Sequence, residues 1–388
     1  MGSGQPVTSV LEEKSVGALV GSAVGDAIGG AVEGWTPEAI RERHGGWVTG
    51  IVGPWYDDWR TARPIAPYHK GDGHITDDTL MTHALVEVYD ERRAHLDAYA
   101  IAESLVPKML NGTRWVPELE ADALLLQRVF LAEKWLVARL HYGHVDPREA
   151  GVGNIVNCGA AMYMAPVGIA NAGDPEGAYA EALDVAGAHQ SSYGREAAGV
   201  FAAAVAAAMI PGATPASAVE TALGLAKDGT RRAVEAVAEA VSQGDGVTDW
   251  EQAIPLLRKA IEPYDTVGPN YRELSMDARR PSRTKAIEEL PVALGFVLVS
   301  EGDVRRAVLG GTNYGRDADS IASMAGAITG ALSGRDGVPA DWAAEIAAAS
   351  KTDLIEPGRV MASVAVDLQA ADARRWARRS EVLETLTR

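Results

Sequence analysis

Three short acidic segments contain the residue types that could do chemistry in this sequence. Asp26 and Glu33 belong to "GDAIGGAVEG", residues 76–79 read "TDDT", and Asp317 and Asp319 belong to "GRDADS". The second and third segments also contain threonine or serine hydroxyls next to the carboxylates. Carboxylates, hydroxyls and waters are the ligands that hard divalent cations such as Mg²⁺ prefer. The segments could therefore form a metal site if the chain brings them together.

Helix capping is the alternative explanation for each segment taken alone. Asp and Thr are favoured at helix N-caps and in first turns, where they accept hydrogen bonds from free backbone N–H groups. A calcium-binding EF-hand is excluded, because Ile321 and Ala322 follow "DADS" where that loop needs another oxygen ligand and then glycine. Capping and metal binding both remain open at this point.

If the three segments come together, their carboxylates repel one another, and bound cations would reduce that repulsion. Glu33, Asp77, Asp78, Asp317 and Asp319 would repel one another if they shared a cleft. Each pair of carboxylates about 4 Å apart costs on the order of 4 kcal/mol at an effective dielectric near 20. Two divalent cations would offset most of that repulsion.

The elements that must position these segments are helices. Alanine-rich stretches with helical spacing recur along the chain, as in residues 197–210 and 231–244, whereas strand-like alternation is nearly absent. No stretch has the composition of a flexible interdomain linker. We therefore expect an all-α fold with a single compact many-helix domain over residues 11–388, preceded by a disordered or vector-derived segment at 1–10.

Two glycine series predict unusually close helix packing. Gly17, Gly21, Gly25 and Gly29 stand four residues apart, as do Gly326, Gly330 and Gly334. Glycine inside a helix costs roughly 0.5–1 kcal/mol relative to alanine, so its repeated use indicates that packing distance outweighs helix propensity. Such helices could bring acidic groups at their ends into one cleft.

Bulk composition excludes several function classes. The net charge of −17 leaves no excess of Lys and Arg to neutralise phosphates, so neither nucleic acid nor an anionic membrane is an expected partner. The only cysteine, Cys158, can form no intramolecular disulfide, which favours a cytoplasmic protein. The apolar run at 197–210 is shorter than the roughly 20 residues that a membrane span needs.

The chain resembles the ADP-ribosylglycohydrolase family, which includes dinitrogenase reductase activating glycohydrolases and ADP-ribosylhydrolases. The matching segments occur in family order: "GALVGSAVGDAIGGAVEG", "TDDTLM", "NCGAAMYMAPVG", "AGAHQSSYGREAAG" and "NYGRDADSIASMAGAITGAL". A single such segment would be weak evidence, but the ordered set is specific.

This resemblance implies a binuclear Mg²⁺ centre, with Mn²⁺ as a substitute, that helps cleave a glycosidic bond at the anomeric carbon of ADP-ribose. The metals would orient the ribose and a water. A neighbouring carboxylate would accept the proton of that water as general base. The implied metal ligands are Thr76, Asp77, Asp78, Asp317, Asp319 and Ser320. The implied catalytic carboxylates are Glu33, Asp77 and Asp78.

The resemblance also implies a substrate pocket, in which this chain departs from the family pattern at two positions. Arg316 stands where the family usually has glycine, and Tyr163 where it commonly has arginine. Arg316 would either bind a phosphate or carboxylate of the substrate or form a salt bridge at the rim. The implied pocket residues are Asn157, Gly159, Ala160, Met162, Tyr163, His189, Tyr314, Gly315 and Arg316.

Three functions follow as hypotheses. The first is an N-glycosyl hydrolase acting on an ADP-ribosylated or otherwise ribosylated substrate. The second is a hydrolase of a small N-riboside or nucleotide conjugate, favoured by the changes at Tyr163 and Arg316. The third is a catalytically silent relative, which retention of all five carboxylates disfavours. No oligomeric state is predicted.

Overall fold

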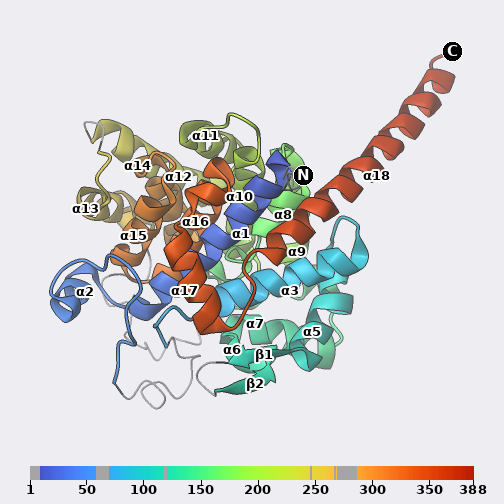
Figure 1. Ribbon diagram of the computed structural model, residues 1–388. Helices are drawn as coiled ribbons and strands as arrows, with labels where there is room; N and C mark the ends of the chain where they lie inside the picture. The colour runs from blue at the N-terminus through green and yellow to red at the C-terminus, as the bar shows by residue number, and fades with distance from the viewer. Residues whose placement is uncertain (1–8, 58–69, 117–119, 245–246, 266–267, 269–285) are drawn as a thin grey trace, which may run out of the picture.

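The computed structural model describes residues 9–57, 70–116, 120–244, 247–265, 268 and 286–388. Helices dominate this part of the chain, as the sequence predicts (Figure 1). The N-terminal helices are α1 (Val10–Gly29), α2 (Pro37–His44), α3 (Asp77–Arg92), α4 (Ala98–Ala100), α5 (Val106–Asn111), α6 (Leu125–Arg128), α7 (Leu131–Leu136), α8 (Ala165–Ala170) and α9 (Pro175–Gly187). The C-terminal helices are α10 (Ser192–Ala208), α11 (Pro215–Leu225), α12 (Asp228–Gln243), α13 (Trp250–Ile261), α14 (Ala286–Val299), α15 (Val304–Tyr314), α16 (Ala318–Ser333), α17 (Ala340–Ser350) and α18 (Glu356–Leu386).

A short hairpin interrupts this pattern. Strand β1 (Thr113–Val116) pairs antiparallel with β2 (Ala121–Leu124), with Thr113 opposite Leu124. Two strands of four residues do not change the all-α class. The predicted N-terminal segment at 1–10 falls mostly on residues 1–8, which lie outside the described residues, and α1 begins at Val10.

The two glycine series pack against each other at the centre of the fold. A Cβ atom added at Gly21 would lie 2.3 Å from the Gly326 carbonyl oxygen, and one at Gly25 would lie 2.2 Å from that of Ala322. The reciprocal Cβ at Gly326 would lie 2.2 Å from the Gly21 oxygen. These distances are shorter than any van der Waals contact, so only glycine allows the backbones of α1 and α16 to approach this closely.

The two helices run antiparallel, because Gly17 faces Gly330 while Gly29 faces Ala318. The C-terminal end of α1 therefore lies beside the N-terminal end of α16 (Figure 1). Asp26 is on the last turns of α1, and Asp319 is in the first turn of α16. The glycine contact thus brings together acidic segments from opposite ends of the sequence.

Residues 10–32, comprising α1 and the 3₁₀ turn Gly30–Val32, are long and apolar enough to cross a membrane by length and composition. The apolar window of this segment is 100% buried within the fold. Lys14 on the same helix is also buried, and its Nζ donates to the carbonyl oxygens of Ala208 at 2.9 Å and Ala331 at 2.8 Å. A cation at these carbonyls complements the C-terminal ends of α10 and α16. Helix α1 is accordingly a core helix.

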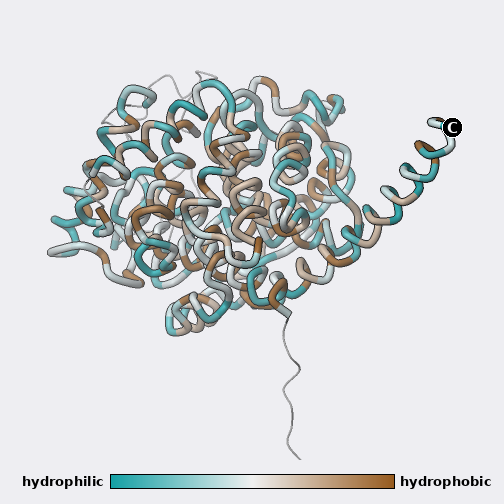
Figure 2. Tube along the Cα trace, turned by 90° about the horizontal axis from the view of Figure 1, so that it is seen from above, coloured by the Kyte–Doolittle hydropathy of each residue, from teal (hydrophilic) through white to brown (hydrophobic). Residues whose placement is uncertain are grey.

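Helix α18 is the element that departs most from the compact body. Its first half packs through buried residues such as Met361, Val364 and Leu368, whereas its second half projects beyond the body (Figures 1 and 2). Trp376 and Leu386 on the projecting half are exposed. The acidic centre described below lies at the C-terminal end of α1 and at the N-terminal ends of α3 and α16, where these residues are buried.

Candidate functional site

Carboxylates from all three acidic segments meet at one place. Ligand atoms of Asp26, Asp78 and Asp319 lie within 4.8 Å of one another. The same limit holds for Glu33, Asp317 and Asp319. Because Asp319 belongs to both groups, the two form one continuous centre, and the convergence that the metal hypothesis requires is present.

Asp26 positions the second segment by capping α3 from a different helix. Both of its carboxylate oxygens accept from the Thr76 backbone N–H, at 3.1 and 2.9 Å, and one accepts from the Thr79 N–H at 3.1 Å. The hydroxyls of Thr76 and Thr79 donate to the same carboxylate. A carboxylate at a helix N-terminus also meets the positive end of the helix dipole. Asp26 therefore fixes where α3 begins.

The residues at the N-cap positions of the second and third segments do not cap their helices through their side chains. Thr76 is the N-cap of α3 and Asp317 the N-cap of α16, yet neither side chain makes a capping hydrogen bond. Asp77 Oδ2 instead accepts from the Phe130 backbone N–H at 3.0 Å, which joins α3 to the start of α7. Asp319 Oδ1 does accept from the Ser320 backbone N–H at 3.1 Å in the first turn of α16, so capping accounts for only part of what these acidic side chains do.

The donor set fits a divalent cation. Asp78 is 2% exposed, and among the described residues its Oδ1 has no hydrogen-bond partner. Burial, then the neighbouring carboxylates of Asp26, Asp77 and Asp317, hold the pKa of Asp78 well above its ordinary value. Burial and then Glu33 do the same to the pKa of Asp319. A divalent cation would satisfy the orphaned oxygen and compensate the repulsion.

Glu33 is placed beside this centre by a loop that is tied to the third segment. The Arg316 N–H donates to the Trp35 carbonyl at 2.7 Å, and the Gly34 N–H donates to the Arg316 carbonyl at 2.5 Å. Gly315 has φ +70°, and a Cβ there would lie 2.1 Å from the Trp35 carbonyl oxygen, so glycine is required. Glu33 is half-buried, whereas Asp78 and Asp319 are buried. Glu33 is therefore the more accessible carboxylate.

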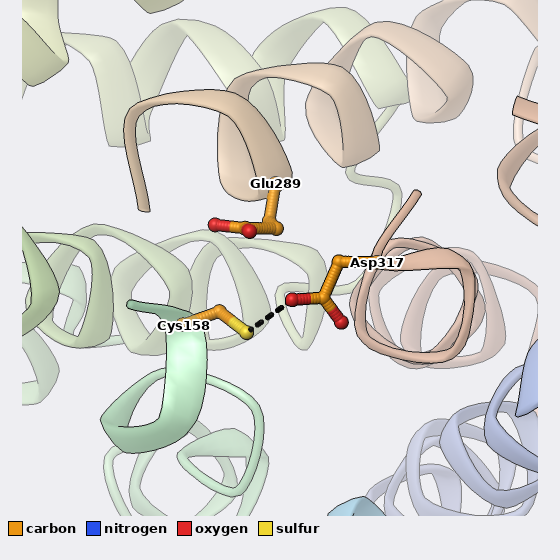
Figure 3. Close-up of side chains that lie close together, drawn as sticks. All are labelled: Cys158, Glu289 and Asp317. Atoms are coloured by element: carbon orange, nitrogen blue, oxygen red, sulfur yellow. Dashed lines mark hydrogen bonds between the residues drawn. The ribbon is translucent and has the colours of Figure 1, made fainter. Parts of the chain in front are cut away.

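Cys158 and Glu289 extend the centre on another side (Figure 3). The Cys158 thiol lies 3.3 Å from Asp317 Oδ2 and 3.2 Å from Ser320 Oγ. Burial, then the nearby carboxylates of Asp317 and Glu289, hold the thiol pKa well above its ordinary value. A neutral thiol is a poor nucleophile, so Cys158 contributes a weak hydrogen-bond donor to Asp317.

His189 and Tyr163, both predicted to line the substrate pocket, are fully buried and bonded to each other. His189 Nε2 lies 3.0 Å from the Ala132 carbonyl oxygen, which makes Nε2 the protonated nitrogen. Nδ1 then accepts from the Tyr163 hydroxyl at 3.0 Å. Burial lowers the pKa of His189 to about 4, so the ring is neutral. Through these two hydrogen bonds His189 connects Tyr163, at the end of the 157–163 segment, to Ala132 on α7.

The other predicted pocket residues lie around the same segment and the third motif. Asn157 is half-buried, and its Oδ1 accepts from the Gly159 N–H at 3.1 Å. Gly159, Ala160 and Met162 are buried. The Tyr314 hydroxyl donates to Glu288 at 2.8 Å. Substrate binding by this set, and metal binding by Thr76, Asp77, Asp78, Asp317, Asp319 and Ser320, stay predictions.

Arg316 directly precedes Asp317 in the third motif. Of the two predicted functions for its side chain, substrate binding or a salt bridge, the structure shows the salt bridge. Its guanidinium donates to Glu288 at 2.8 Å, to Asp265 at 3.1 Å and to the Gly268 carbonyl at 2.8 Å. Arg258 contacts the same two carboxylates. The Arg316 side chain is only 4% exposed, and its backbone φ is +58°, a conformation that favours glycine. Arg316 thus joins Glu288 of α14, Asp265 and Gly268 to the third motif.

Replacing Arg316 with alanine is expected to lower the free energy of unfolding by about 3 kcal/mol, because the buried carboxylates of Glu288 and Asp265 would lose one of the guanidinium groups that pair with them. Chemical denaturation of the wild type and the variant measures the loss. Arg231→Ala is the control, since Arg231 and its partner Glu235 are largely exposed and such pairs contribute little. Equal small losses in both variants would show that the Arg316 network is not stabilising.

A cavity of about 350 Å³ lies elsewhere, where α18 meets α9 and the loop after α3. Its lining residues include His95, Asn171, Glu181, Asp372 and Trp376. None of these belongs to the acidic centre. The chemistry of the side chains, and not this cavity, therefore identifies the candidate site.

Asp26 and Glu289 of the centre were not among the predicted site residues, nor was Glu133, a buried acid near Asp77 and Asp317. Asp26 was visible in the first motif, but its function as a cap for α3 depends on a contact 50 residues away in the sequence. Glu289 follows Glu288 directly before an apolar run, which was a signal for buried acids. Glu133 has no motif around it, and only the fold reveals its position.

Residues 8–377 match the family model described as ADP-ribosylglycohydrolase. The chain belongs to the ADP-ribosylglycohydrolase family. This confirms the resemblance and places the protein among glycosyl hydrolases of the ADP-ribosyl type. The carboxylate clusters at the meeting point of α1, α3 and α16 are those that could hold metal in this member of the family.

One relative and one solved structure are similar to this chain. The uncharacterized protein YegU of Escherichia coli (strain K12) is 25% identical over 344 residues, which cover 88% of this chain and 94% of YegU. A solved structure described as an ADP-ribosylglycohydrolase-related protein complex superposes with a TM-score of 0.60 at 19% identity, covering 92% of this chain and 98% of that one. The second similarity concerns the fold alone, and it confirms the predicted all-α ADP-ribosylglycohydrolase architecture.

Proposed function

We propose that this protein is a Mg²⁺-dependent hydrolase that cleaves the glycosidic bond at the anomeric carbon of an ADP-ribosyl or related ribosyl group. One observation carries the proposal. Asp26, Asp78 and Asp319 are buried together, while Asp78 Oδ1 has no hydrogen-bond partner among the described residues. Buried carboxylates gathered at such cost are typical of a site that functions with a cation bound.

The residues that would hold two Mg²⁺ ions, or Mn²⁺ in their place, are Thr76, Asp77, Asp78, Asp317, Asp319 and Ser320. Bound Mg²⁺ supplies Lewis-acid polarisation and a fixed template for oxygen atoms. The protein side chains supply the remaining steps. The buried carboxylates stabilise the positive charge that develops on the ribose ring as the glycosidic bond breaks.

Glu33 is the proposed general base, because it is the more accessible carboxylate and lies within 4.8 Å of Asp317 and Asp319. It accepts a proton from the attacking water, whose oxygen forms the new bond to the anomeric carbon. The leaving group departs with the electron pair of the broken glycosidic bond. Asp77 and Asp78 complete the proposed catalytic set, because their negative charges stabilise the positive charge that develops on the ribose ring.

A second candidate is hydrolysis of a small N-riboside or nucleotide conjugate. Arg316 favours it, because the guanidinium that could have met a diphosphate is bonded to Glu288, Asp265 and Gly268. A catalytically silent relative is the third and weakest candidate. A ribosylated partner, no nucleic acid or membrane partner, and a cytoplasmic location remain part of the proposal.

A substrate panel tests the proposed function. ADP-ribosylated arginine and serine peptides, NAD and free nucleosides would be incubated with the protein and Mg²⁺, and the released sugar measured by chromatography. We expect release of ADP-ribose from at least one peptide, with loss of turnover in excess EDTA and recovery on adding Mg²⁺. Turnover of small molecules alone would overturn the protein-directed activity in favour of the second candidate. No turnover of any compound would favour the silent relative.

A further inference from the structure

Glu133 on α7 is a buried carboxylate that belongs to none of the recognised motifs. Its side chain is 1% exposed. Among the described residues, its Oε2 has no hydrogen-bond partner. Leaving such an acceptor buried and unpaired costs roughly 1–3 kcal/mol, and more if it is charged. Hydrogen bonds among the described residues therefore do not explain why a glutamate occupies this buried position.

Two independent contacts locate Glu133 at the acidic centre. The start of its helix is bound to the centre, since the Phe130 N–H donates to Asp77 Oδ2 at 3.0 Å. On the other side, a Cβ added at Gly159 would lie 2.4 Å from Glu133 Oε1. The residue before Gly159 is Cys158, whose thiol lies 3.3 Å from Asp317. Glu133 therefore lies between the Asp77 and Asp317 sides of the centre.

Electrostatics agrees with this placement. Burial, then the carboxylates of Asp77 and Asp317, hold the pKa of Glu133 well above its ordinary value. His189 Nε2 lies 3.6 Å from Glu133 Oε1. That nitrogen already donates to the Ala132 carbonyl, and the ring is neutral. Glu133 consequently has no compensating positive charge from His189.

A comparison with Glu181 shows what a structural glutamate looks like in this fold. Glu181 is also buried, but it accepts from the Tyr89 hydroxyl, the Leu96 N–H and the Asn171 amide, each at 2.7 Å. Every one of these bonds joins elements of the body. Glu133 Oε2 makes no comparable contact with described residues, so a purely structural function does not account for it.

We propose that Glu133 positions the reacting groups by accepting a hydrogen bond, through Oε2, from an O–H group at the acidic centre. The donor is either a ribose hydroxyl of the substrate or a water beside the carboxylates; both present the same chemistry. Gly159 leaves space next to this carboxylate, since any side chain there would collide with it. This inference rests on the proposed function, because it assigns Glu133 to the same site.

Glu133→Gln is the first test, because glutamine keeps the volume while removing the charge. We expect the thermal stability of the metal-free variant to equal or exceed that of the wild type, since a buried acid that is repelled by Asp77 and Asp317 is removed. We expect kcat/KM to fall about a hundredfold through loss of the strong acceptor. Glu181→Gln is the matched control, expected to lower stability and leave ADP-ribose affinity unchanged. Glu133→Asp tests whether a carboxylate restores part of the activity.

Calorimetric titration with ADP-ribose, together with the kinetic constants, distinguishes the two donors. Weaker ADP-ribose binding with a raised KM identifies a ribose hydroxyl, whereas a lowered kcat with unchanged binding identifies the water. Wild-type binding and kinetics in Glu133→Gln would overturn the inference and leave the proposed function intact. If the wild-type protein binds neither Mg²⁺ nor ADP-ribose, the proposed function is overturned and this inference with it.

Discussion

Replacing Asp319 with asparagine is expected to abolish Mg²⁺ binding at one position and to lower kcat/KM by at least about a thousandfold. Asp319 is 3% exposed and belongs to both carboxylate groups, with Asp26 and Asp78 on one side and Glu33 and Asp317 on the other. Asparagine has nearly the same shape but no charge, so it weakens both groups at once. Calorimetric Mg²⁺ titration and the substrate panel measure the two effects.

The fold should survive this change. Burial, then repulsion from Glu33 and Asp78, already raises the pKa of Asp319, so removing its charge relieves an unfavourable interaction in the metal-free protein. Asp341→Asn is the control, because Asp341 is likewise in the first turn of its helix but is exposed. Full Mg²⁺ binding and turnover in Asp319→Asn would contradict the binuclear centre. Absence of Mg²⁺ binding by the wild type would contradict it more directly.

The second large effect is expected from a single methyl group at Gly25. In Gly25→Ala the new Cβ would lie 2.2 Å from the Ala322 carbonyl oxygen, so α1 and α16 must separate. We expect the free energy of unfolding to fall by at least about 3 kcal/mol, although alanine is the better helix former by up to about 1 kcal/mol. Denaturant unfolding followed by circular dichroism measures the change.

Gly224→Ala on α11 is the matched control for this substitution. Nothing lies within 4 Å of a Cβ added at Gly224, so only the gain in helix propensity should remain. The control is expected to be neutral or slightly stabilising. If both variants were equally stable, the close approach of α1 and α16 would not be the reason for the glycine series. Mg²⁺ affinity should also fall in Gly25→Ala, because the same contact aligns Asp26 with Asp319.

Local sequence carried enough information to predict the helical class and the motif carboxylates. The glycine series are spaced at a helical interval, and their prediction as close-packing surfaces is confirmed by the contacts of Gly21 and Gly25. The carboxylates of Glu33, Asp78, Asp317 and Asp319 were predicted from motif and resemblance, and the fold brings them together. Their function as metal ligands stays a prediction.

Other features could not be predicted, because they depend on partners that are distant in sequence. Asp26 caps a helix that begins 50 residues later, and Arg316 pairs with Glu288 and Asp265 on other elements. Glu133 is an ordinary glutamate by local pattern, and only packing makes it buried and unpaired. The hairpin β1–β2 was missed, because its short strands have no clear alternation of apolar residues.

The pairing of α1 with α16 also determines when this protein can become functional during its synthesis. Chains are made from the N-terminus and begin to fold as they emerge. Asp26, Glu33, Asp77 and Asp78 leave the ribosome early, but their partners Asp317 and Asp319 follow only after most of the chain has been made. Until α16 docks, the glycine surface of α1 has no partner and the acidic centre is half built. The proposed binding of cations should therefore be a late event, available only to chains in which α1 and α16 have met.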